Sequence, residues 1–86
     1  MHEYHLAKSV LKSILEKVKD IGDIKRVSAV KLKIGELKMV TADTFKETFS
    51  EIAHNTLCDN ALLDIDIVKG DTVVVEDIEA EFNEEN

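Results

Sequence analysis

The sequence predicts an α+β fold in which two helices pack on one face of a small three-stranded mixed sheet, in the order α-β-α-β-β. Two segments repeat apolar residues every three or four positions, as amphipathic helices do. Three other segments alternate apolar and polar residues, as half-buried strands do. The chain has 86 residues, no proline and three glycines, so we expect one small domain with short connections.

The two helices are expected near the start and in the middle of the chain. The first should span Tyr4–Ile21, and Gly22 is suited to end it. Its buried face should carry the apolar residues at helical spacing, which are Leu6, Ala7, Val10, Leu11, Ile14, Leu15 and Val18. The second should be capped by Thr41, carry Asp43 in its first turn and run to about Leu57.

The three strands are expected over Lys25–Ile34, Ala61–Val68 and Thr72–Ile78. If the first two are parallel neighbours, the crossover between them should be right-handed. The turn residues Lys69-Gly70-Asp71 predict that the second and third strands form an antiparallel hairpin.

Alternation in the first strand predicts which side chains face the core. Those expected to face it are Ser28, Val30, Leu32 and Ile34, and those expected on the opposite, open face are Val27, Ala29, Lys31 and Lys33. Lys31 and Lys33 should then lie near Asp64 and Asp66 of the neighbouring strand, within reach of weak cross-strand pairing.

The net charge of −7 is concentrated at one end of the chain. Residues 1–75 hold 11 basic and 12 acidic side chains, whereas residues 76–86 hold six acidic side chains and no basic one. We therefore divide the chain into a single domain at 1–78 and an acidic C-terminal tail at 79–86. A near-neutral body with an acidic end argues against nucleic acid as a partner, because nucleic-acid binding needs a basic surface.

The same reading excludes several other classes. No apolar run is long enough to span a membrane, and the N-terminus lacks the pattern of a secretory signal, so a cytoplasmic location is expected. A single cysteine, Cys58, allows neither an intrachain disulfide nor a cysteine-cluster metal site. Enzyme activity is not expected, because no phosphate loop or nucleophile elbow is present. Cys58 does follow His54 at helical spacing, but a partly buried structural thiol is the commoner explanation.

The first residues offer a metal chelate. The α-amine of Met1, the backbone nitrogen of His2 and the His2 imidazole can bind one metal together, closing a five-membered and a six-membered ring. A deprotonated amide favours square-planar Ni(II) or Cu(II) over tetrahedral Zn(II). The fourth donor could come from Glu3 or His5. Any protein that starts Met-His has the same atoms, so an incidental exposed histidine is the alternative.

Three segments, MHEYHLAKSVLKSILE, VSAVKLKIGEL and TFKETFSEIAHNT, resemble the HypA family in order and spacing. The pattern includes Met1-His2-Glu3 and Ile34-Gly35-Glu36-Leu37. The resemblance implies a nickel-delivery accessory protein for [NiFe] hydrogenase maturation, a family in which some members also serve urease. It implies a nickel(II) site at Met1, His2 and Glu3, with His5 either a further ligand or local variation. Some members add an acidic residue near the second helix, where this chain has Thr41 and Asp43, and Thr41 cannot act as a carboxylate.

The resemblance also implies an absence. The family carries a zinc domain with two C-x-x-C pairs between the last two strands, and here only Lys69 separates ALLDIDIV from GDTVVVEDIEAE. No structural zinc is expected. The implied partners are a HypB-type GTPase and the hydrogenase large subunit, and the implied state is a monomer or a strand-exchanged dimer. The alternative function is a metal-independent protein-interaction module with a HypA-like fold.

Overall fold

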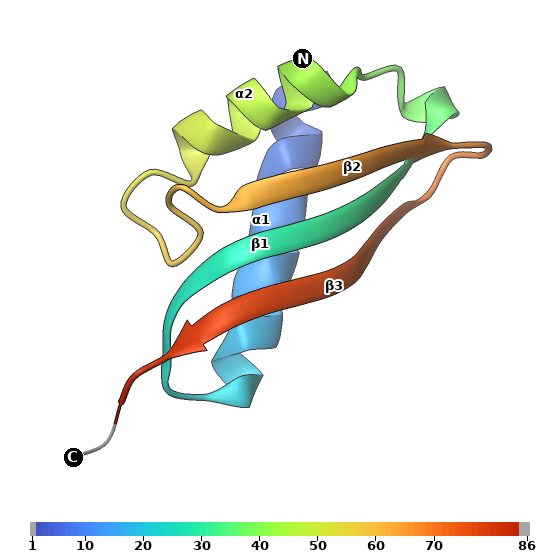
Figure 1. Cartoon of the computed structure of the whole chain (residues 1–86). Coiled ribbons are helices and arrows are strands. Elements are labelled where there is room, and N and C mark those ends of the chain that lie inside the picture. Colours follow the sequence, from blue (N-terminus) through green and yellow to red (C-terminus); the bar gives the residue numbers. More distant parts are fainter. Residues whose placement is uncertain (1, 85–86) are drawn as a thin grey trace.

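The computed structural model describes residues 2–84, which contain two α-helices, one short 3-10 helix and three strands (Figure 1). In chain order these are α1 (His2–Ile21), β1 (Ile24–Gly35), η1 (Glu36–Lys38), α2 (Ala42–Ile52), β2 (Leu62–Val68) and β3 (Val73–Phe82). The α+β class and the α-β-α-β-β order agree with the prediction from the sequence. Neither α-helix within residues 2–84 has both the length and the apolarity that a membrane span requires.

Local signals set the ends of both helices. α1 begins at His2, earlier than the predicted start at Tyr4, and it stops where Gly22 takes a φ of +90°. α2 begins after Thr41, the predicted N-cap. It ends at Ile52 instead of near Leu57, because the following turn includes Asn55 at a φ of +67°, which a helix cannot accommodate.

The sheet has the order β2-β1-β3, so β1 lies in the centre. It pairs in parallel with β2, an arrangement that the sequence allowed but did not decide, and antiparallel with β3. The predicted hairpin between the second and third strands is therefore wrong. β1 is the longest strand and carries four fully buried apolar side chains, which are Val27, Val30, Leu32 and Ile34. The central position covers these side chains, whereas an edge position would expose more of them.

The connection from β2 to β3 crosses the end of β1 instead of turning back on itself. The Gly35 N–H donates to the Thr72 carbonyl at 2.7 Å, and the Leu37 N–H donates to the Gly70 carbonyl at 3.0 Å. A Cβ atom on Gly35 would lie 2.6 Å from the Gly70 carbonyl carbon, closer than real Cβ contacts. Glycine at position 35 therefore allows the two backbones to meet.

An irregularity in the β1–β3 register changes which side chains of β1 are buried. The pairing shifts between Val27 and Ala29, as a β-bulge does. Val27 is consequently fully buried, although simple alternation placed it on the open face. Ser28 is only partly buried, and its hydroxyl donates to the Glu79 carbonyl at 3.1 Å. The predicted orientations of these two residues are wrong for this reason.

β3 continues past the predicted end at Ile78 as far as Phe82. The additional residues pair with the first half of β1, and the Arg26 Nη1 atom lies 3.0 Å from the Glu81 Oε2 atom. Residues 79–82, which the sequence assigned to the acidic tail, therefore belong to the sheet. Backbone hydrogen bonds to β1 hold these residues in the sheet, and the number of acidic side chains gives no information about such bonds.

The open face of the sheet carries ion pairs. Lys31 and Lys33 of β1 stand opposite Asp64 and Asp66 in the β1–β2 register, as expected. Their ammonium groups, however, pair with Glu76 of β3, at 3.6 Å and 2.9 Å respectively. The hydrogen bond from Lys33 lowers the pKa of Glu76, and the same bond raises the pKa of Lys33. These side chains are solvent-exposed, so the pairs contribute little to stability.

The opposite face carries one hydrophobic core, which both α-helices cover (Figure 1). Its buried members come from α1, β1, α2 and the turn after α2, and are Ala7, Val10, Leu11, Ile14, Val18, Val27, Val30, Leu32, Ile34, Phe45, Phe49, Ala53 and Cys58. The α1 residues predicted for this face are present, except that Leu6 and Leu15 lie at its margin. The core fixes α2 against α1, and this contact positions the start of both helices.

Candidate metal centre

Glu3 lies in the first turn of α1 on the side that faces α2. Its Oε2 atom accepts a hydrogen bond from the Thr44 Oγ1 hydroxyl of α2. Glu3 is partly buried, whereas the next two residues, Tyr4 and His5, are exposed. Side chains on a helix lean toward its N-terminus, so this contact holds the carboxylate near the beginning of the chain.

Met1 and the side chain of His2 lie outside the described part of the structure. The backbone of His2 begins α1. The first four N–H groups of an α-helix have no partner within the helix. The amide nitrogens of His2 and Glu3 can therefore bind a metal without breaking a helical hydrogen bond, which suits the chelate expected from the sequence.

His5, the possible additional ligand, does not lie beside Glu3. Residues two apart on a helix face different directions. The His5 ring instead contacts Tyr4 edge-on, with ring centroids 5.8 Å apart. Among the side chains that the structure describes, no three from His, Cys, Asp and Glu gather closely enough to hold a metal ion. The expected donor set therefore depends on Met1 and His2 together with Glu3.

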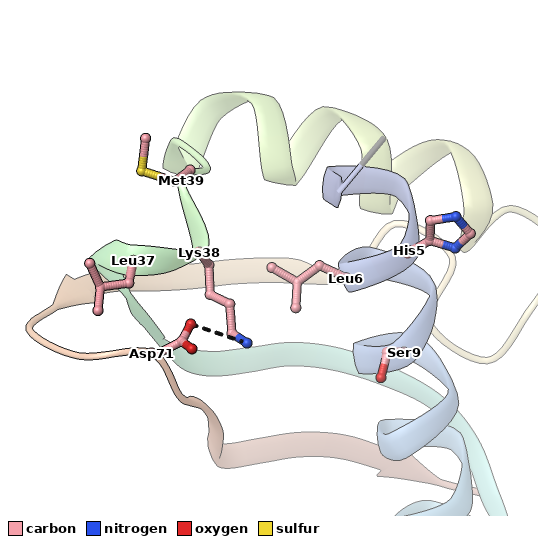
Figure 2. A pocket seen from close by; sticks show the side chains of 7 residues that line it. All are labelled: His5, Leu6, Ser9, Leu37, Lys38, Met39 and Asp71. Carbon is pink, nitrogen blue, oxygen red and sulfur yellow. Dashed lines mark ion pairs between the residues drawn. The ribbon is translucent and has the colours of Figure 1, made fainter.

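A cavity of about 470 Å³ lies between α1, η1 and the β2–β3 connection. Figure 2 shows Leu6 pointing into it toward Lys38, whereas His5 lies at its margin and points away. The Lys38 Nζ atom lies 3.4 Å from the Asp71 Oδ1 atom (Figure 2). Leu37 and Met39 at its edge are 63% and 84% exposed. The lining is mainly apolar, and its polar side chains are His5, Ser9 and this ion pair, so the cavity offers few ligands for a metal.

The start of α2 contributes to the site through a residue that the sequence did not single out. Thr41 and Asp43 are the positions nearest to the acidic residue that the resemblance implies. Thr41 acts as the helix cap, and Asp43 is exposed in the first turn. Thr44 makes the contact with Glu3. The spacing Thr41-x-x-Thr44 resembles a capping box, which was the available signal for a polar pair at this helix end.

Cys58 is buried in the core, and His54 does not activate it. The His54 Nδ1 atom lies 3.5 Å from the Asp59 Oδ2 atom. Burial raises the pKa of the Cys58 thiol to about 11. Nucleophilic and metal-binding cysteines need a lowered pKa, so this thiol is structural.

The raised pKa of Cys58 predicts slow thiol chemistry in the folded protein. At pH 8 only about one thiol in a thousand should be ionised if its pKa is about 11. We expect labelling by a disulfide reagent to be about a hundredfold slower in the folded protein than in guanidinium. Stopped-flow absorbance measures both rates. Equal rates in the two conditions would show that the thiol is accessible in the folded state.

Comparison with known proteins places the chain in a family. A family model described as "Hydrogenase/urease nickel incorporation, metallochaperone, hypA" matches residues 1–83. The "Hydrogenase maturation factor HypA" of Methanococcus vannielii is 40% identical over 73 residues, covering 80% of this chain and 59% of that protein. The protein of the same name from Methanocaldococcus jannaschii is 32% identical over 73 residues, with the same coverage. The chain thus spans about three fifths of the length of these relatives.

A solved structure agrees with this assignment. The "Solution structure of the Ni metallochaperone HypA from Helicobacter pylori" matches with a TM-score of 0.67 and 25% identity. The match covers 90% of this chain and 72% of that chain. The family model covers residues 1–83, from the Met-His-Glu start through all three strands, so this chain belongs to the HypA family.

Proposed function

We propose that this chain binds one Ni(II) ion through Met1, His2 and Glu3 and delivers it for the maturation of [NiFe] hydrogenase. The observation that carries the proposal is the family match over residues 1–83, which includes the Met-His-Glu start. The amine and amide of the first two residues and the His2 imidazole supply nitrogen donors, which Ni(II) accepts in a square-planar arrangement. Glu3 supplies a carboxylate oxygen beside them.

The start of α1 supports this chemistry electrostatically. The N-terminus of a helix carries a partial positive charge, which opposes a bound cation. Glu3 adds a negative charge in this first turn, and a deprotonated amide would add another. These charges offset the helix dipole. Because binding requires loss of the amide proton, nickel affinity should fall as the pH is lowered.

The delivery step requires partners that accept or donate nickel. We propose a HypB-type GTPase and the hydrogenase large subunit, which are the partners that the family resemblance implies. Structural zinc is not part of the proposal, because the only cysteine, Cys58, is buried with a raised pKa.

Replacing His2 with alanine should weaken Ni(II) binding at least about 100-fold, which exceeds the usual effect of losing a supporting contact around a metal. Isothermal titration calorimetry on untagged protein that starts at Met1 measures the affinity. The control is His54→Ala, which removes another exposed imidazole. His5→Ala should stay within about twofold of the parent, because His5 faces away from Glu3. Equal affinity in His2→Ala and the parent would refute the proposal.

A further inference from the structure

Two hydroxyl groups at the start of α2, those of the N-cap Thr41 and of Thr44, form a hydrogen-bonded chain that ends on Glu3. The Thr41 and Thr44 hydroxyl oxygens lie 2.8 Å apart, and Thr41 Oγ1 also accepts from the Thr44 N–H at 3.2 Å. An ionised carboxylate can only accept hydrogen bonds. Thr44 must therefore donate its single hydroxyl proton to Glu3 and accept from the Thr41 hydroxyl.

This arrangement gives the chain one direction, from the Thr41 hydroxyl to the Thr44 hydroxyl and on to the Glu3 carboxylate. Hydrogen bonds that run in one direction polarise each other and strengthen as a group. The alternative acceptor for Thr44, the Thr41 carbonyl oxygen, lies 3.3 Å away, beyond the usual length of such a bond. The Glu3 carboxylate is therefore the favoured partner of the Thr44 hydroxyl.

The chain is built on a rigid support. Phe45, the residue after Thr44, is completely buried, and its ring stacks on Phe49 with centroids 6.2 Å apart. These rings fix the first turn of α2 in the core, while the Thr41 cap fixes its hydrogen bonds. Glu3 lies farther from such an anchor, because Ala7 is the first fully buried residue among the described side chains of α1. The rigid element thus restrains the less constrained one.

We propose that Thr44 is a positioning residue, which holds the Glu3 carboxylate in place beside the nickel donors of the first two residues. This role rests on the proposed function and extends it to a second element of the fold. A carboxylate held through Oε2 keeps its other oxygen as a potential ligand. Fixing it before nickel arrives avoids the loss of side-chain freedom on binding. The effect should be modest, because Thr44 is exposed and water competes for the same carboxylate.

The test compares Thr44→Val, which removes the hydroxyl and keeps the shape, with Thr44→Ser, which keeps the hydroxyl. Thr48→Val, one turn later in α2, is the matched control for the same substitution in the same helix. We expect Thr44→Val to weaken Ni(II) binding about fivefold to tenfold, at or below the lower end of the roughly 10–100-fold effect of supporting contacts around a metal. The nickel affinities of the Thr44→Ser and Thr48→Val variants should stay within about twofold of the parent affinity. Adding Thr44→Val to a Glu3→Gln variant should cause no further loss of affinity, because both substitutions remove the same interaction.

A second measurement needs no metal. In nickel-free protein, Thr44→Val should shift the NMR amide resonances of residues 3–6, and Thr48→Val should leave them in place. The positioning role would be overturned if the Thr44→Val variant bound nickel as tightly as the parent, or if the Thr48→Val variant lost as much affinity as Thr44→Val. Either result would leave the proposed function intact. A parent protein that binds no nickel would overturn the proposed function and the positioning role together.

Discussion

Replacing Phe45 with alanine is expected to lower the free energy of unfolding by about 3–5 kcal/mol. Phe45 is completely buried in the core and stacks on Phe49 at an interplanar angle of 25°. The substitution removes the ring and leaves a cavity between α2 and the sheet. A domain of this size has a total stability of about 4–13 kcal/mol, so the substitution should remove a large share of it.

Urea unfolding followed by circular dichroism measures this effect. The matched control is Phe82→Ala, which removes the same ring from a position that is 58% exposed, and it should cost less than about 1 kcal/mol. Similar losses in the two variants would show that Phe45 does not anchor the helix. Phe45→Leu should cost less than Phe45→Ala, because it leaves a smaller cavity.

Replacing Gly35 with alanine should lower the free energy of unfolding by about 3 kcal/mol, the upper part of the range for inserting atoms into a packed site. The backbone at Gly35 has a φ of −65°, which any residue can adopt, so the cost comes only from space. The new Cβ atom would lie 2.6 Å from the Gly70 carbonyl carbon and 2.8 Å from the Asp71 nitrogen. These backbone atoms cannot rotate away as a side chain could.

Gly22→Ala separates crowding from backbone conformation. Gly22 has a φ of +90° and no atom within 4 Å of an added Cβ, so alanine there should cost about 1 kcal/mol through its conformation alone. Thermal unfolding of the two variants under the same conditions makes the comparison. If the Gly35→Ala variant were as stable as the Gly22→Ala variant, the β2–β3 connection would be able to move away from β1 at little cost in free energy.

Of these two positions, Phe45 also matters for the candidate metal centre. Phe45 holds the turn of α2 that carries Thr44, and Thr44 contacts Glu3. Loosening α2 should therefore weaken the support of the Glu3 carboxylate even where the nitrogen donors are unchanged. Gly35 precedes η1 and the start of α2 in the chain, but it takes no part in the hydrogen bond between Thr44 and Glu3. We therefore expect the Gly35→Ala substitution to act mainly on stability.

The candidate site was predictable from the sequence only in part. The donors proposed on Met1 and His2 were expected from ring sizes and the family pattern, and Glu3 was expected from the family pattern; both signals depend on neighbouring residues. The contact between Glu3 and Thr44 joins residues far apart in the chain. No local pattern at Glu3 indicates its partner, because that partner depends on how α1 and α2 pack.

Apolar periodicity was sufficient to predict the presence of both helices and the alternating strands, and therefore the α+β class. The residue type at position 41 was sufficient to predict the Thr41 cap. These signals depend only on residues close together in the sequence, which do not change with the tertiary structure. Only the tertiary structure decided that β1 is central, that the connection through Gly70 crosses the end of β1, that β3 extends to Phe82 and that Thr44 reaches Glu3. These features depend on burying the apolar side chains of β1 and pairing its backbone on both edges, and this balance exists only when the whole sheet and both helices are assembled.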